Sequence, residues 1–199
     1  SSTGENRENK RGGTGSLFLT DMSHPKIDIG IFGRRNTGKS TLVNLLTGQD
    51  TAIVSDIPGT TTDPVRKSVE IFGIGPVILV DTAGVDDGGE LGRKRVDKSL
   101  DTLKRVECAV LLITGNQFGQ YELDLIHQFR RFNVPYLILH NKSDISRIAT
   151  LTRTVIKRHS DAEVLDFSAK DPGNLEIIID ALRKIVPRTS LQPDRLIGD

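Results

Sequence analysis

A glycine-rich loop between a strand-like and a helix-like segment is the feature that most constrains this chain. Residues 33–40 read GRRNTGKS and match the pattern G-x-x-x-x-G-K-S/T at every fixed position. The preceding segment Lys26–Phe32 is rich in strand-forming residues, and the following segment Ser40–Gly48 has helical apolar spacing and a terminal glycine. Such a loop turns main-chain N–H groups and a helix N-terminus toward an anion, so it predicts phosphate binding.

Strand-like and helix-like segments alternate through the rest of the chain. Further strands are predicted at residues 65–74, 76–82, 108–114, 134–142 and 163–169, and helices at 90–106, 121–132, 145–159 and 174–186. Only Gly75 separates the strands 65–74 and 76–82, so these two must form an antiparallel hairpin. The predicted fold is α/β, with a six-stranded, mostly parallel sheet, one antiparallel strand and helices on both faces.

Length and composition suit one domain of 199 residues with loose ends. We expect the domain over residues 25–188, a disordered leader or linker over 1–24, and a C-terminal tail or linker stub over 189–199. The apolar runs are too short for a transmembrane helix, so no membrane partner is expected. A net charge of +1 gives no reason to expect nucleic acid as a partner.

The chain has one cysteine, Cys108, which excludes an internal disulfide and leaves no ligand set for an iron–sulfur cluster in this fragment. We expect Cys108 in the core, in a cytoplasmic protein, or one of an organelle stroma or matrix if the leader belongs to a longer targeted protein. His140 is expected to pack at an edge, and Arg34 and Arg35 are expected to be exposed loop charges.

The glycine-rich loop supplies the expected phosphate contacts. Lys39 offers a point charge to the β- and γ-phosphates, and Ser40 offers a hydroxyl to Mg²⁺. The predicted nucleotide-binding set of this loop comprises Asn36, Thr37, Gly38, Lys39, Ser40 and Thr41.

Two further segments are expected at the Mg²⁺ ion and the γ-phosphate. Asp81 ends a predicted strand, where its carboxylate can hold Mg²⁺, and Gly84 can bring a main-chain N–H to the γ-phosphate. The threonine-rich segment Thr51–Val65 can order around the same groups. Thr61 is the preferred Mg²⁺ ligand there, with Thr60 and Thr62 as alternatives.

A third segment points to the base of the nucleotide. Asn141, Lys142 and Asp144 belong to the sequence NKSD that follows a predicted strand. The Asp144 carboxylate can accept hydrogen bonds from N1–H and the exocyclic amine of guanine, a donor pair that adenine lacks. The next strand ends in the segment that could cover the base, Ser168, Ala169 and Lys170. Together these motifs indicate a guanine nucleotide, GTP or GDP.

The loop 33–40, the threonine-rich segment, the segment Asp81–Gly84, NKSD and Ser168–Lys170 are five elements that follow one another over Lys26–Pro187. Together they resemble the translation-factor-related GTPases. Within that class, GRRNTGKST, VSDIPGTTTDPV and GPVILVDTAGVDDGGELGRKRV resemble the GTPase domain of the FeFe-hydrogenase maturation factor HydF. The resemblance implies a Ras-like fold and GTP hydrolysis with Mg²⁺ and K⁺, with Asn36 at the position of the potassium ligand. As partners it implies the remaining domains of that factor, radical-SAM maturases, the apo-hydrogenase and a nucleotide-dependent homodimer.

The residue after DTAG is Val85, which cannot orient an attacking water, so slow intrinsic turnover is expected. By resemblance an acidic residue further along replaces the usual glutamine. Glu90 is the candidate, with Asp86 and Asp87 as alternatives. Two other readings stay open: a nucleotide-dependent binding switch with negligible turnover, and a TrmE- or Era-like GTPase of tRNA modification or ribosome assembly. Those relatives usually carry an arginine where Thr62 stands.

Overall fold

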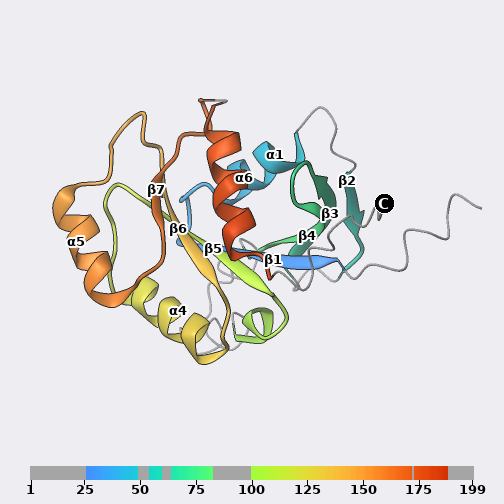
Figure 1. The fold of residues 1–199 in the computed structure, drawn as a ribbon, viewed down its shortest axis with the longest axis horizontal. Helices are drawn as coiled ribbons and strands as arrows, with labels where there is room; N and C mark the ends of the chain where they lie inside the picture. The colour runs from blue at the N-terminus through green and yellow to red at the C-terminus, as the bar shows by residue number, and fades with distance from the viewer. Residues whose placement is uncertain (1–25, 49–53, 60–63, 83–99, 172, 188–199) are drawn as a thin grey trace, which may run out of the picture.

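The computed structural model describes residues 26–48, 54–59, 64–82, 100–171 and 173–187. One sheet runs through this part of the chain (Figure 1). Its strands are β1 (Ile27–Gly33), β2 (Val54–Ile57), β3 (Val65–Ile71), β4 (Gly75–Asp81), β5 (Cys108–Thr114), β6 (Tyr136–Asn141) and β7 (Val164–Asp166). They lie in the order β2-β3-β4-β1-β5-β6-β7. Only β3 runs against its neighbours, so the predicted mostly parallel α/β fold is confirmed.

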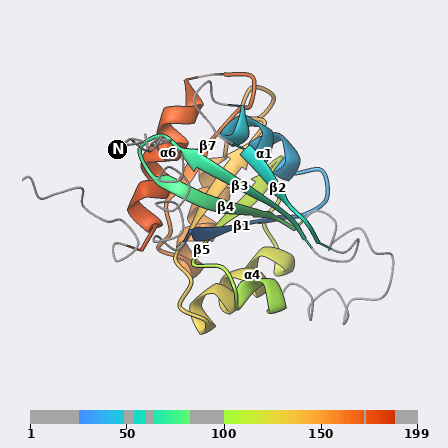
Figure 2. The ribbon, with the colours of Figure 1, turned by 90° about the vertical axis from the view of Figure 1, so that its right-hand side faces the viewer.

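Helices cover both faces of the sheet, as predicted. They are α1 (Lys39–Thr47), α4 (Gln120–Arg131), α5 (Thr150–His159) and α6 (Asn174–Ile185). Figure 2 shows α1 and α6 on one side of the sheet and α4 on the other. The strands are apolar on both faces: Val110 of β5 packs in the core with α1 and α6, whereas its neighbour Leu111 packs in the core with α4 and α5. This two-sided burial is why β5 reads as a continuous apolar run.

The sheet has seven strands in the described residues, and the prediction of six was wrong by the edge strand β2. That strand lies within the threonine-rich segment that we expected to be a loop. Val54, Ser55 and Asp56 are exposed, so β2 buries little and shows no apolar alternation. Pairing with β3, from Val54 opposite Val69 to Ile57 opposite Arg66, makes it a strand.

The predicted hairpin is confirmed as β3 and β4, but its turn lies earlier than expected. Ile71 pairs with Gly75, so the connection consists of residues 72–74 rather than Gly75 alone. Gly73 has φ +92°, a left-handed conformation that glycine adopts without strain. Ile74 is buried in the core shared with α6, which explains why it reads as part of a strand.

Helix α5 begins at Thr150 and not at Ile145 as predicted. The N–H groups of Ile148 and Ala149 are bonded to side chains of other segments instead of to helical carbonyls. Of the predicted helix 90–106, only its end is described, and residues 100–103 are helical. Cys108 is fully buried, as expected. None of the helices in the described ranges is long and apolar enough to span a bilayer.

Candidate functional site

The residues singled out by the sequence gather at one edge of the sheet. Lys39 follows β1, Asp81 ends β4, Asn141 ends β6 and Ser168 follows β7. These four strands are parallel, so their carboxyl ends meet at the same edge. Ligands of open α/β sheets bind outside this edge, so the topology alone makes it the candidate site.

The phosphate loop, residues 33–40, is shaped by its own main chain. Asn36 and Gly38 adopt left-handed conformations, with φ of 65° and 97°. The buried Lys39 side chain curls back into the loop, where its Nζ donates to the carbonyl oxygen of Gly33 and, over 3.0 Å, to that of Arg34. Helix α1 begins at Lys39, so the N–H groups of its first turn have no earlier helical carbonyl to bond and open at the loop. The arrangement is a cationic cradle for phosphate.

A second loop, residues 141–149, contains NKSD and is bonded directly to the phosphate loop. The buried Asn141 donates from Nδ2 to the carbonyl oxygen of Thr37 over 2.8 Å. Lys142 donates from Nζ to the carbonyl oxygen of Asn36 over 3.0 Å. A Cβ at Gly38 would lie 2.0 Å from Asn141 Nδ2, so glycine is required at this contact as well as by its φ. We call residues 141–149 the base loop.

The base loop and the segment after β7 meet at Asp144. Ser168 Oγ donates to Asp144 Oδ1 over 2.8 Å, and Lys170 Nζ lies 3.5 Å from Oδ2. The Ser168 hydrogen bond holds the pKa of the Asp144 carboxyl below its ordinary value, with Lys170 adding to the effect. Ala169 is half-buried beside them. Asp144 is therefore an ionised acceptor at neutral pH.

Two oxygen ligands suited to Mg²⁺ lie side by side beneath the phosphate loop. Ser40 Oγ is 3.4 Å from Asp81 Oδ2, a separation that two oxygens in the shell of one Mg²⁺ can share. Mg²⁺ takes one or two protein oxygens and completes its shell with phosphate oxygens and water, so this pair fits the ion. Within the described residues, no group of three or more His, Cys, Asp or Glu could hold a metal by itself.

Several predicted residues lie outside the described residues. They are Thr61 with its alternatives Thr60 and Thr62, Gly84, Val85, and Glu90 with its alternatives Asp86 and Asp87. Thr41 is described and exposed in the first turn of α1.

Arg34 is not a free loop charge, contrary to expectation. Its Nε and a terminal guanidinium nitrogen donate to the two carboxylate oxygens of Glu122 over 2.7 and 2.9 Å. Glu122 is 1% exposed and also accepts from the N–H of Gly119, and this paired carboxylate raises the pKa of Arg34. Tyr121 donates from its hydroxyl to the carbonyl oxygen of Gly33 over 3.1 Å. The first turn of α4 thus anchors the phosphate loop.

Sequence reasoning missed this anchor because the paired residues are 88 positions apart. A usable signal was present: Glu122 is the third residue of a helix that follows a glycine, the place where an acid bonds back to the helix start. That signal explains why a carboxylate can be buried at Glu122, but it does not identify Arg34 as its partner.

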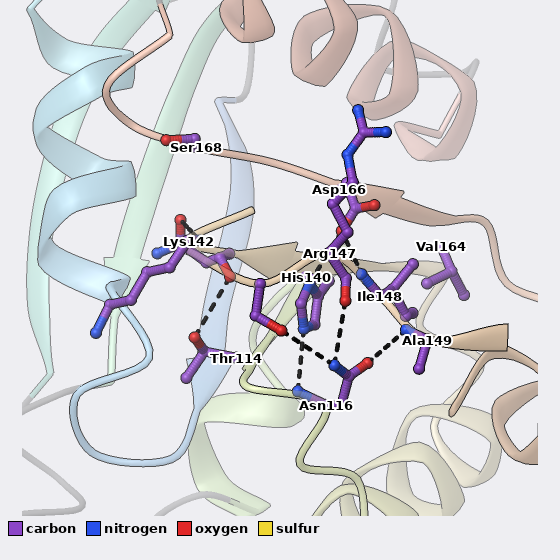
Figure 3. A network of polar contacts seen from close by, with 12 residues as sticks. Thr114, Asn116, His140, Lys142, Arg147, Ile148, Ala149, Val164, Asp166 and Ser168 are labelled. Carbon is purple, nitrogen blue, oxygen red and sulfur yellow. Dashed lines mark hydrogen bonds and ion pairs between the residues drawn. The ribbon is translucent and has the colours of Figure 1, made fainter. Parts of the chain in front are cut away.

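His140 was also misjudged, since it lies in the interior of the sheet and not at an edge. It is 0% exposed on β6, with Nδ1 2.9 Å from Asp166 Oδ1. Its Nε2 accepts from the main-chain N–H of Asn116 over 3.1 Å. Figure 3 shows that these side chains meet directly behind the base loop.

Comparison with known proteins agrees with this geometry. Residues 28–142 match the family described as 50S ribosome-binding GTPase. The chain is similar to the tRNA modification GTPase MnmE of Caldicellulosiruptor saccharolyticus, with 31% identity over 163 residues that make up 81% of this chain and 35% of that protein. The chain spans about a third of the length of the curated relatives it matches.

Two solved structures have a similar fold. A variant of Aquifex aeolicus Era bound to GDP and AlF4− has a TM-score of 0.63 and 25% identity, over 88% of this chain and 62% of that one. Era in complex with MgGDPNP and nucleotides 1506–1542 of 16S ribosomal RNA has a TM-score of 0.63 and 24% identity, over 88% of this chain and 60% of that one.

Proposed function

This chain belongs to the 50S ribosome-binding GTPase family and is a GTPase of the TrmE/Era type, and we propose that it binds GTP along the sheet edge described above. One observation carries the proposal: the phosphate loop and the base loop are hydrogen-bonded to each other through Asn141 Nδ2 and the Thr37 carbonyl. This bond keeps the two loops at a fixed distance from each other. One nucleotide can therefore place its phosphates at the phosphate loop and its base at the base loop.

The phosphates lie in the cradle of residues 33–40. Lys39 exchanges its carbonyl partners for oxygens of the β- and γ-phosphates, and the N-terminus of α1 adds its positive dipole end. Membership of this family implies use of Mg²⁺ with the nucleotide, and Ser40, Asp81 and Thr61 would hold the ion. When bound, Mg²⁺ neutralises phosphate charge. Gly84 donates its N–H to the γ-phosphate.

The base lies between NKSD and the segment Ser168–Lys170. Asp144 accepts from N1–H and the exocyclic amine of guanine while Ser168 keeps its carboxylate oriented. Binding adenine would leave these acceptors unpaired, so GTP is preferred to ATP.

Turnover by this domain alone is slow, because Val85 cannot orient water. Glu90 supplies the missing group when two domains pair, and Asn36 would hold K⁺, which when bound would offset transition-state charge as an arginine finger does. The place of Asn36 supports this role, because the residue is exposed and left-handed within the phosphate loop itself.

Two roles are proposed for the longer protein to which such a domain belongs. The sequence identity with tRNA modification GTPases favours a TrmE-like role, in which GTP hydrolysis is coupled to tRNA modification. The segments TTTDPV and DDGGELG favour a part in hydrogenase maturation, with radical-SAM maturases and apo-hydrogenase as partners. Binding of the full-length protein to tRNA or to apo-hydrogenase, each measured with GTP and GDP, separates the two roles.

Phosphate release from GTP, with ATP as control, tests the proposal in KCl and in NaCl at matched ionic strength. We expect release that is specific for GTP, faster in K⁺, and rising more than linearly with protein concentration. Release that is linear and indifferent to the cation would contradict the roles of Asn36 and Glu90. Equal release from ATP would contradict the reading of NKSD.

A further inference from the structure

A network of side chains lies behind the base loop and uses none of the predicted nucleotide ligands (Figure 3). Its centre is Asn116, which stands in a left-handed conformation (φ 57°) in the connection between β5 and α4. From Nδ2 it donates to Ser146 Oγ over 3.3 Å and to the carbonyl oxygen of Arg147 over 3.1 Å. Its Oδ1 accepts from the N–H of Ala149 over 2.7 Å.

His140 connects this centre to the neighbouring strand. Because Nε2 accepts the main-chain N–H of Asn116, the ring proton stands on Nδ1, where it is donated to Asp166 Oδ1. The same carboxylate oxygen accepts the N–H of Ile148 over 3.0 Å. The end of the base loop is therefore bonded to side chains of two other places, Asn116 in the β5–α4 connection and Asp166 of β7, and His140 of β6 joins these two to each other.

The placement of Asp144 depends on both ends of its loop. At the near end Asn141 is bonded to the phosphate loop. The turn that contains Asp144 is closed by the N–H groups of Ile145 and Ser146, both donated to the carbonyl of Lys142. Directly after this turn comes the stretch that Asn116 holds. If the loop is already ordered before the ligand binds, binding does not carry the entropic cost of ordering it, and the affinity for the ligand is higher.

We propose that Asn116 and His140 are positioning residues for guanine recognition: they fix residues 146–149 and so hold Asp144 where it meets the base. The inference rests on the proposed binding of guanine by Asp144. The inference has one consequence that can be measured. The hydrogen bond from the exocyclic amine of guanine to Asp144 weakens if the Asp144 carboxylate moves, so the contribution of that amine to affinity reports the position of the carboxylate.

The test compares the affinities of the whole chain for GDP and for inosine diphosphate, which lacks the exocyclic amine. The variant is Asn116→Gly, which keeps the left-handed backbone and removes the three side-chain bonds. The control is Asn133→Gly, the same change at an exposed left-handed residue (φ 53°) in the turn between α4 and β6, at the opposite edge of the sheet.

We expect the wild type to bind GDP about 10- to 100-fold more tightly than inosine diphosphate, the range of one hydrogen bond to a charged group. In Asn116→Gly the preference falls by about 5- to 10-fold, and in Asn133→Gly it is unchanged. A purely structural role for the network lowers the melting temperature and leaves the preference as in wild type, which would overturn the inference.

A wild type without preference for GDP would overturn the proposed base recognition instead, and the inference with it. If Asn116→Gly does not fold, Asn116→Asp serves the same purpose. It keeps the acceptor for Ala149 and sets an oxygen against the carbonyl of Arg147, so a partial loss of preference is expected. An unchanged preference in that variant contradicts the proposal.

Discussion

The phosphate loop and the base loop lie side by side in one site but are held in place by different means. The phosphate loop is formed mainly by bonds among eight consecutive residues, with Lys39 and Thr37 bonded to carbonyls of the same loop. The base loop is held by side chains of Asn116 and Asp166, which lie 33 and 18 positions away along the chain from the groups they bind. A motif can encode the first arrangement, whereas the second needs the assembled sheet.

The contrast is sharpest at Lys39, where the largest effect is expected. Lys39→Ala removes the ammonium group that is bonded to carbonyl oxygens inside the phosphate loop, and we expect nucleotide affinity to fall by about 100-fold or more. Isothermal titration with GDP measures the loss, and Lys104→Ala, an exposed lysine, is the control. Affinity like that of wild type would show that residues 33–40 do not bind the phosphates.

Gly38→Ala tests the contact between the phosphate loop and Asn141 of the base loop. Its Cβ would stand 2.0 Å from Asn141 Nδ2 in a residue with φ +97°, so both loops must shift. Gly75→Ala is a matched control, because φ is +109° there and nothing lies within 4 Å of the added Cβ. In urea denaturation, the free energy of unfolding of the control should fall by about 1–2 kcal/mol, the cost of the backbone strain alone. We expect only Gly38→Ala to lose GDP binding. Loss of binding in both variants would show that backbone strain, and not the contact between Gly38 and Asn141, causes the effect.

Asp144→Asn tests the base loop without touching the phosphates. An amide can donate to the oxygen that xanthine carries in place of the guanine amine, so preference should move from GDP toward xanthosine diphosphate. The size expected is about 10- to 100-fold in the ratio of the two affinities, the value of hydrogen bonds to a charged group. A competition assay with both nucleotides measures the ratio, and strict guanine preference in the variant would contradict the assignment of NKSD.

Arg34→Lys tests whether the phosphate loop also depends on a distant anchor. Lysine keeps the charge but loses the two-pronged bond to the buried Glu122, and we expect unfolding to become easier by about 1–2 kcal/mol. Arg66→Lys is the control, since Arg66 pairs with Asp28 at 2.8 Å and is similarly exposed. GDP affinity should change by less than about 3-fold. A loss of GDP affinity of about 5-fold or more would show that the phosphate loop depends on a distant anchor, and so would break the contrast between the loops.

Sequence reasoning did best where neighbouring residues decide the structure. The strand, loop and helix around Lys39, the β3–β4 hairpin, and helices α4 and α6 follow from local pattern and are present within a few residues of the predicted bounds. It did worst at β2, whose exposed residues carry no apolar pattern, and at residues 145–149, whose N–H groups find side-chain partners rather than a helical turn.

By itself, then, the amino-acid sequence determined the fold class and the order in which the site residues follow the strands, because apolar periodicity and glycine-rich loops act over short distances. Only the tertiary structure decided that Arg34 pairs with Glu122, that His140 is buried between Asn116 and Asp166, and that Asn141 bridges the two loops. Those contacts join residues far apart in the chain, and no local pattern states which partner a buried polar group will find.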